Sequence, residues 1–393
     1  MSGKAIIAGG GIGGLAAALA ISRAGWRVQL IERNPNFSEF GAGVQLGPNV
    51  TRVLQRWGLN EALGEVAAYP DRLHVFHAVS GREIGMLRLG KDSVEKYGAP
   101  YAALHRADLQ QLLLQAVQRA GVQTELNQSL ASYEELPASI RIQTKQGMML
   151  QGDALIGADG LWSRVRELML ADGQPRPTGH LAYRALLLQT HLPEHLKSQQ
   201  VKVWLGPHLH VVQYPVRRGE WLNVVVIAHG KVSTDLQGWD HDTTTESLHQ
   251  VTSGTHPHLQ DLIKATTNWR LWSLCDRRPM QSASEHACVR VALVGDAAHP
   301  MRPYLAQGAG MAIEDADCLG QLMCEAASSI NIDVPGLLKR YANSRWQRNA
   351  RVQKRALRNG RIFHLTGLAS RGRDLSISLL GERLLDMPWL YRG

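Results

Sequence analysis

Hydrophobic positions follow two different patterns along this chain, and each pattern predicts a different kind of element. Near the start, the short apolar run Lys4–Ala8 precedes a glycine-rich turn, and the alanine-rich stretch Leu15–Ala24 follows the turn. A second apolar run, Trp26–Ile31, comes next. Short apolar runs bounded by glycine are typical of buried parallel strands, so we expect a strand, a helix and a second parallel strand here.

The middle of the chain, residues 175–272, alternates apolar and polar residues in short runs such as Gln200–Leu205 and Leu222–Ile227. This alternation is typical of a sheet. Further on, segment 301–315 is expected to be a loop that opens a helix at its glycines, and basic residues recur at helical spacing over residues 341–358. With 393 residues, the chain is long enough for two cores with a ligand cleft between them.

The glycine-rich turn has the spacing G-x-G-x-x-G at Gly9, Gly11 and Gly14. These glycines suit a tight turn, close approach to a pyrophosphate and close helix packing, and the helix N-terminus then faces the phosphates. The second strand ends in Glu32, 18 residues beyond Gly14. A carboxylate there accepts a ribose hydroxyl bond and repels a 2′-phosphate, so the nucleotide is expected to be FAD or NAD.

Two later segments are also apolar strands that run into small or acidic turns. The first, Leu155–Arg166, contains Asp159, and the second, Val291–Pro300, contains Asp296. Together with the glycine motif, they resemble the three sequence fingerprints of the class A flavoprotein aromatic hydroxylases, the para-hydroxybenzoate hydroxylase-like family. The three segments have the family's order and span nearly the whole chain.

This resemblance implies an α/β fold: a Rossmann-like FAD-binding domain with an inserted β-sheet substrate domain and C-terminal helices. The FAD-binding domain is expected to take residues 1–70 and 99–174 as its first two parts and residues 278–340 as its third. The sheet domain takes residues 71–98 and 175–277, and a C-terminal helical region takes residues 341–393.

The resemblance also implies which residues hold FAD. Asp296 is expected to bond a ribityl or ribose hydroxyl, Asp159 to belong to a strand-turn that serves FAD and NAD(P)H, and Arg106 to reach the pyrophosphate. Segment 41–49 resembles the family segment that lines the flavin ring. The helix after Gln307 points a positive N-terminus at the reduced flavin. The expected cofactor residues are Gly9, Gly11, Gly14, Glu32, Arg33, Gly43, Val44, Arg106, Asp159, Asp296, Gly308, Ala309 and Gly310.

Several polar residues near these motifs allow structural interpretations as well. Ser163 and Arg166 fit a cofactor role and, equally, a helix cap with a surface charge. His299 is interpreted as a turn residue that fixes the loop behind Asp296. The basic residues of 341–358 indicate either a solvated helix face or packing against the FAD-binding domain or a dimer partner.

The candidate substrate residues come mainly from the sheet region. His210 and Tyr214 are four apart, so both project to one face if the strand is regular, and His208 is an alternative on that face. Histidine titrates near neutrality, which suits a base that takes a phenol proton. By resemblance, His210, Tyr214 and Gln307 are catalytic, and Asp71, Tyr101 and Pro303 line the substrate pocket.

Composition narrows the other possibilities. The formal net charge of +9 fits an anionic cofactor and a carboxylate substrate. Nucleic-acid binding is not expected, because the basic residues form no motif with interleaved aromatic residues. No apolar stretch reaches the length of a membrane span, and glycines interrupt Ala5–Ala20, so we expect a soluble, cytoplasmic protein. The four cysteines lack metal-type spacing; they are expected to be reduced, and no metal site is predicted.

By resemblance, the function is hydroxylation of a phenolic, hydroxybenzoate-type acid with NADH or NADPH and O2 through a flavin C4a-hydroperoxide, and a homodimer is the family expectation. Segment 304–308 resembles the 3-hydroxybenzoate 6-hydroxylases more than the salicylate 1-hydroxylases. The 6-hydroxynicotinate 3-monooxygenases share a similar His/Tyr pair, so that activity remains an alternative. Outside the family's reaction, the alternatives are a flavin dehydrogenase or oxidase without oxygen insertion and a non-catalytic flavin-binding protein.

Overall fold

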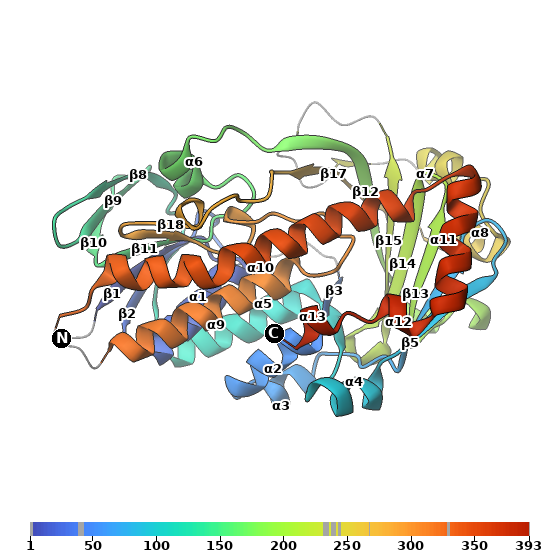
Figure 1. Ribbon diagram of the computed structural model, residues 1–393, viewed down its shortest axis with the longest axis horizontal. Coiled ribbons are helices and arrows are strands. Elements are labelled where there is room, and N and C mark those ends of the chain that lie inside the picture. The colour runs from blue at the N-terminus through green and yellow to red at the C-terminus, as the bar shows by residue number, and fades with distance from the viewer. Residues whose placement is uncertain are drawn as a thin grey trace. The chain divides into compact units, whose positions relative to one another are not determined.

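The computed structural model describes residues 3–37, 43–230, 236, 241–242, 245–266, 268–327 and 331–392 (Figure 1). The chain divides into two compact units. The first unit comprises residues 1–40, 107–175 and 276–355, and the second comprises residues 41–106, 176–275 and 356–393. The domain boundaries expected from the sequence stay a prediction.

The first unit is built on a six-stranded sheet with the order β18-β19-β11-β1-β2-β7. Its strands are β1 (Lys4–Ala8), β2 (Arg27–Ile31), β7 (Gln123–Glu125), β11 (Ala154–Gly157), β18 (Ala287–Cys288) and β19 (Val291–Leu293). All neighbouring strands pair in parallel except the edge strand β18. The expected strand-helix-strand start is confirmed, because α1 (Ile12–Arg23) connects β1 and β2.

Helices and a small second sheet complete the first unit. Its helices are α1, α5 (Arg106–Arg119), α6 (Arg164–Leu170), α9 (Gly308–Ala326) and the first part of α10 (Val334–Phe363). The small sheet is made of β8 (Leu130–Glu135), β9 (Ile140–Thr144) and β10 (Met149–Gly152). Helices α1 and α9 pack closely because small residues meet: a Cβ on Gly320 would lie 2.8 Å from the Cβ of Ala20.

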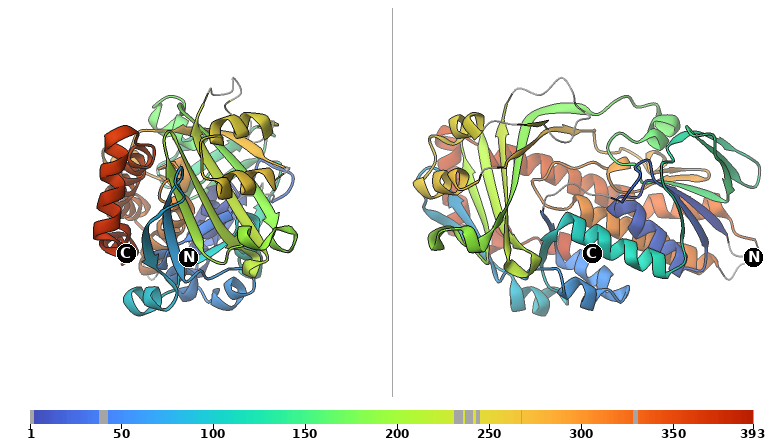
Figure 2. Two further views of the ribbon diagram at one scale, coloured as in Figure 1. Left: turned by 90° about the vertical axis from the view of Figure 1, so that its right-hand side faces the viewer. Right: turned by 180° about the vertical axis from the view of Figure 1, so that it is seen from behind.

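The second unit is built on a large sheet (Figure 2). The sheet has eight strands in the order β16-β17-β12-β15-β14-β13-β4-β5. Its strands are β4 (Arg72–His77), β5 (Glu83–Arg88), β12 (Arg176–Leu188), β13 (Val201–Gly206), β14 (Leu209–Val216), β15 (Trp221–His229), β16 (His241–Asp242) and β17 (Arg270–Asp276). The two strands expected at Gln200–Leu205 and Leu222–Ile227 are confirmed as β13 and β15. A two-stranded sheet of β3 (Gly43–Leu46) and β6 (Ala102–His105) accompanies them.

Short helices surround this sheet. They are α2 (Pro48–Arg56), α3 (Asn60–Gly64), α4 (Gly90–Tyr97), α7 (Thr245–Thr252), α8 (Pro257–Lys264), α11 (Gly367–Leu380), α12 (Glu382–Leu385) and α13 (Pro388–Tyr391). Among the described residues, no helix is both long and apolar enough to cross a membrane. The four cysteines form no disulfide. Cys318 and Cys324 lie in α9.

The two faces of the eight-stranded sheet differ in what covers them. One face packs its fully buried Val211, Val224 and Val226 against Leu259 and Leu262 of α8. Because side chains alternate along a strand, the opposite face carries the even-numbered residues of β12 and β14 and the odd-numbered residues of β15 around them. We call that opposite face the polar face, because His210, Tyr214 and Asn223 lie on it.

Candidate functional site

The glycine-rich turn has the geometry of a phosphate-binding loop. Gly9 has φ +110°, and a Cβ added to Gly14 would lie 1.8 Å from the carbonyl oxygen of Gly9, so a side chain at either position is excluded. Helix α1 begins at Ile12 with Gly11 as its N-cap and no side-chain hydrogen bond at the cap. Its first backbone N–H groups are therefore not capped by a side chain, as anion binding at a helix N-terminus requires.

Glu32 organises this turn from the end of β2. Its buried carboxylate accepts hydrogen bonds from the backbone N–H of Gly10 (2.6 Å) and of Asn34 (2.8 Å). On the other side of the turn, Gln110 of α5 donates to the Gly10 carbonyl at 3.2 Å. A carboxylate has about four acceptor positions, so Glu32 retains capacity for a ribose hydroxyl. The neighbouring Arg33 is exposed.

Asp159 accepts hydrogen bonds from the start of helix α6, whose N-cap residue is Ser163. It accepts hydrogen bonds from the Ser163 hydroxyl (2.5 Å) and from the backbone N–H groups of Arg164 (2.7 Å) and Val165 (3.1 Å). The hydroxyl of Ser163 accepts from the N–H of Arg166 at 2.9 Å, which confirms the helix-cap interpretation of that residue.

The surface-charge interpretation of Arg166 is wrong. Its side chain is fully buried, where it forms an ion pair with Asp172 at 2.7 Å and donates to the carbonyls of Ala297 (3.1 Å) and Ala298 (2.6 Å). A buried guanidinium needs several acceptors, and carbonyls of the turn after β19 supply two of them. Arg166 therefore ties α6 to the turn that contains Asp296.

His299 fixes the loop behind Asp296, as its sequence position suggested. Its Nε2 lies 2.5 Å from a carboxylate oxygen of Asp315 in α9, and the same oxygen accepts from the Gly295 N–H at 3.1 Å. Helix α9 begins at Gly308, which confirms the expected opening at the glycines, and its N-cap Gln307 makes no side-chain cap bond. Gln307 itself is buried.

The remaining expected residues of this loop lie around the start of α9. Pro303 is half-buried. Ala309 and Gly310 belong to the first turn of the helix, and a Cβ on Gly308 would lie 4.0 Å from a carboxylate oxygen of Asp296. The carboxylate of Asp296 is thus close to an uncapped helix N-terminus, within the first unit.

In the second unit, the two-stranded β3–β6 sheet packs against the polar face of the large sheet. The Gly43 N–H donates to the Asn223 side-chain oxygen at 2.7 Å, and a Cβ on Gly43 would lie 2.5 Å from the Tyr214 ring. Tyr101, at the start of β6, donates its hydroxyl to Gln45 at 2.7 Å. The structure therefore brings Tyr101, an expected pocket residue, and Tyr214, an expected catalytic residue, to the same two-stranded sheet.

Other residues expected at the site are distributed around the second unit. Val44 lies in β3, and half-buried Arg106 begins α5. Asp71 precedes β4 and is exposed, with its carboxylate beside Gly90. Gly41 and Ala42 of the expected flavin-lining segment lie outside the described residues.

His210 and Tyr214 do lie on one face of a regular strand, because both are on β14 in unbroken register with β15. His208 does not share that face: it lies in the turn before β14 with φ +58° and is exposed. Because the chain reverses direction between β13 and β14, His208 adopts a turn conformation there and does not belong to the strand.

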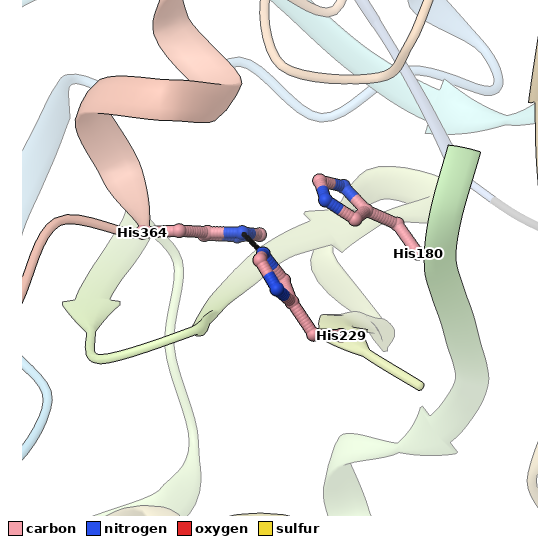
Figure 3. A group of neighbouring side chains, drawn as sticks. All are labelled: His180, His229 and His364. Atoms are coloured by element: carbon pink, nitrogen blue, oxygen red, sulfur yellow. Dashed lines mark hydrogen bonds between the residues drawn. The ribbon is translucent and has the colours of Figure 1, made fainter. Parts of the chain in front are cut away.

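His210 ends a chain of three bonded imidazoles. Its Nδ1 lies 2.8 Å from Nε2 of His364. Nδ1 of His364 in turn lies 3.0 Å from Nε2 of His229, as Figure 3 shows. His180 stacks on the ring of His229. Burial lowers the pKa of His210 to about 3 and that of His364 to about 2, so both rings are neutral at physiological pH.

Tyr214 is equally well buried. Burial raises its pKa above the ordinary value, partly opposed by the positive charge of Arg184. Tyr214 is therefore a neutral hydroxyl beside a cation, which is able to donate a hydrogen bond to an anion.

Comparison with known proteins is decisive for the family. A family model described as FAD binding domain matches residues 3–356. The chain belongs to the FAD-binding domain family. The uncapped starts of α1 and α9, the close glycine contacts and the buried Glu32 all fit such a cofactor.

Several relatives that match over nearly the whole chain are named as hydroxylases or monooxygenases of aromatic acids. The chain is 38% identical to 3-hydroxybenzoate 6-hydroxylase of Polaromonas naphthalenivorans over 390 residues, covering 98% of this chain and 95% of the relative. It is 34% identical to 6-hydroxynicotinate 3-monooxygenase of Bordetella bronchiseptica, covering 90% and 91%. A salicylate hydroxylase substrate complex superposes with a TM-score of 0.83 at 25% identity, covering 100% and 96%.

A structure of Klebsiella pneumoniae HpxO complexed with FAD and uric acid also superposes, with a TM-score of 0.85 at 25% identity, covering 97% and 94% of the two chains. These matches confirm the expected α/β fold of an FAD-dependent aromatic hydroxylase with C-terminal helices. The protein is thus an FAD-dependent monooxygenase of the aromatic-hydroxylase class.

Sequence reasoning missed two polar residues on the polar face. Arg184 and Asn223 both lie on this face, in β12 and β15. The sequence carried a signal for Arg184, because it is the single charge in the apolar run Leu181–Leu188. A charge in an otherwise buried strand calls for a partner or a function.

Proposed function

We propose that this protein hydroxylates 3-hydroxybenzoate at position 6, with NADH or NADPH and O2 as co-substrates. The observation that carries the proposal is the similarity to 3-hydroxybenzoate 6-hydroxylases over nearly the whole chain, with 38% identity over 98% of this chain in the Polaromonas relative. A second such enzyme, from Aquipseudomonas alcaligenes, is 36% identical over 376 residues.

The residues of the first unit would hold the cofactor. The glycine turn and the start of α1 suit the pyrophosphate, Glu32 suits the adenosine ribose, and Asp296 suits a ribityl or ribose hydroxyl. When bound, FAD supplies the redox chemistry: it accepts a hydride from the nicotinamide and delivers one oxygen atom from O2 to the ring. The start of α9 would stabilise negative charge on the flavin through its uncapped N–H groups.

The residues of the second unit would prepare the phenol. A phenolate ring is the better nucleophile, so the phenol proton has to be accepted by a base within hydrogen-bond reach. We assign His210 to that role, because it is neutral and its other nitrogen contacts His364. The charge that develops on the buried imidazole would be balanced by the phenolate. Tyr214 would donate a hydrogen bond to the bound substrate, and Gln307, Tyr101, Pro303 and Asp71 stay predicted site residues.

The similar proteins suggest two alternative substrates, 6-hydroxynicotinate and salicylate. The 6-hydroxynicotinate 3-monooxygenases are similar over 90% of this chain, and the salicylate hydroxylase complex shares the fold. All three candidate substrates are aromatic acids that carry a ring hydroxyl. A cytoplasmic location and a homodimer stay predictions.

The test is substrate-dependent oxidation of NADH and NADPH by the purified yellow protein. The panel is 3-hydroxybenzoate, salicylate and 6-hydroxynicotinate, and products are identified by mass spectrometry under 18O2. We expect 3-hydroxybenzoate to give the largest stimulation and a product that gains one labelled oxygen at position 6. A product without label would instead indicate a dehydrogenase, and no stimulated oxidation by any acid would refute the substrate class.

A further inference from the structure

The strand pairing places a third functional group on the polar face. In register, His210 and Ala182 flank Ile227 of β15, and one step along the strands Val212 and Arg184 flank Val225. The next step places Tyr214 beside Asn223. Paired residues on neighbouring strands share a face, so Arg184 belongs to the row between the row of His210 and the row of Tyr214.

This middle row is more accessible than the two β14 residues on either side of it. His210 and Tyr214 are buried at 0% and 3% exposure, because the C-terminal segment with Phe363 and the two-stranded β3–β6 sheet pack on their rows. Arg184, Val212 and Val225 between them are only half-buried. We call Val212, Val225 and Arg184 the strip: the two valines form its apolar part, and the arginine lies at one end. The predicted catalytic residues His210 and Tyr214 lie on either side of it.

Arg184 has no hydrogen-bond partner among the described residues. Its buried Nε is unsatisfied, and its guanidinium lies 4.7 Å from the ring centroid of Trp272, a cation–π contact. Tyr214 is neutral, and the nearby Arg106 is of like charge. Burial lowers the pKa of Arg184 to about 10, so it remains charged near pH 7. An unpaired guanidinium at this depth is costly unless an anion completes the site.

We propose that Arg184 is the residue that binds the carboxylate of the aromatic acid, with Val212 and Val225 under the ring. The planar guanidinium matches a carboxylate through two parallel N–H···O bonds, and the Trp272 ring holds its plane. The acid group then lies at one end of the strip and the ring hydroxyl is left for His210 and Tyr214. This inference rests on the proposed function, because it names the carboxylate-binding residue of that same site.

The experiment compares Arg184→Gln and Arg184→Lys with the wild-type holoenzyme. Dissociation constants are measured from the perturbation of flavin absorbance by three ligands: 3-hydroxybenzoate, benzoate and 3-hydroxybenzamide. We expect Arg184→Gln to weaken binding of both acids by about 10- to 100-fold and to leave the amide within about twofold, because only the charged hydrogen bonds are lost. Arg184→Lys should recover part of the loss, since it restores charge without the fork.

The matched control is Lys202→Gln. Lys202 pairs with Gln213 of β14, so it lies on the opposite face of the same sheet, and its loss removes an equal charge. It should leave binding of all three ligands unchanged. If the control weakens acid binding as much as Arg184→Gln, the effect is long-range electrostatics and the proposal is wrong.

Two further outcomes overturn the assignment while the proposed function stands. If Arg184→Gln weakens 3-hydroxybenzoate and the amide but not benzoate, Arg184 binds the phenol oxygen. If the variant is purified without FAD while the control is yellow, Arg184 serves the cofactor. The proposed function fails separately, when the wild-type enzyme does not hydroxylate 3-hydroxybenzoate at all.

Discussion

The two units differ in how they satisfy the charge of an arginine, as buried Arg345 and half-buried Arg184 show. Arg345, in the first unit, donates to Asp315 (2.9 Å), Glu314 (3.0 Å) and Asn349 (3.2 Å), so every part of its guanidinium is engaged. Arg184, in the second unit, donates to no described residue. The pKa of Asp315 is lowered because His299 and Arg345 offset its burial. A satisfied charge holds the fold together, whereas an open one indicates a ligand.

The largest effect is expected when the satisfied arginine is removed. Arg345→Met leaves Asp315 and Glu314 buried without their main partner, so the free energy of unfolding should fall by about 3–5 kcal/mol. Chemical denaturation followed by fluorescence measures the change. A loss below about 1 kcal/mol would show that the cluster is not structural.

Acid should destabilise the protein through its neutral buried histidines. The pKa of His210 and of His286 is lowered by burial to about 3 in the folded state, while about 6.5 is expected in the unfolded chain. The unfolded state therefore binds protons first as pH falls below about 6.5, and stability decreases from there toward pH 3. Between pH 7 and 5 the expected loss is up to about 2 kcal/mol per histidine.

Denaturation at the two pH values, repeated on His286→Gln, checks this prediction. Removing one titrating ring should reduce the pH dependence of the unfolding free energy. An unchanged dependence would mean that other groups cause the acid effect.

Glu32 is a buried charge of a third kind, because its hydrogen bonds within the described residues all come from backbone N–H groups. Glu32→Gln keeps one acceptor oxygen and replaces the other by an NH2 donor, so one of the two hydrogen bonds from Gly10 and Asn34 is lost together with the charge. We expect about 1–2 kcal/mol lower stability and a smaller fraction of bound FAD after purification. Thermal unfolding and the ratio of flavin to protein absorbance measure the two effects; full FAD content with normal affinity would argue against the ribose role.

The smallest expected effect on stability belongs to the open arginine. Arg184→Leu removes no intramolecular hydrogen bond, so the unfolding free energy should change by less than about 0.5 kcal/mol or increase. Activity with the aromatic acid should nevertheless be lost. A strong destabilisation would show that Arg184, like Arg345, stabilises the folded protein, and the proposed difference between the two arginines would be wrong.

The sequence predicted those features that depend on local pattern. The G-x-G-x-x-G spacing predicts the turn and helix of residues 9–23, and the alternation predicts β13 and β15. The start of a helix at Gly308 and the position of Glu32 at a strand end followed in the same way. Each of these depends on residues near one another in the chain, and local backbone preferences are sufficient to specify them.

Partners from distant segments could not be predicted in this way. Ser-x-x-Arg left Arg166 as a surface charge, although it lies buried against a turn more than 130 residues away. His208 has the same parity as His210 but lies in the hairpin turn. The contact between His210 and His364 joins residues 154 apart, and no periodicity links them.

By itself, then, the sequence determined the class of fold, the cofactor-binding turn and the family resemblance, because these follow from short motifs and from the spacing of apolar residues. Only the tertiary structure decided which charges are satisfied. Both arginines lie in regular elements, and although Arg184 is the single charge in the apolar run Leu181–Leu188, the local sequence shows no partner for either of them. The difference arises from strand pairing and helix packing, which bring acceptors to one guanidinium and leave the other beside two valines on an accessible strip.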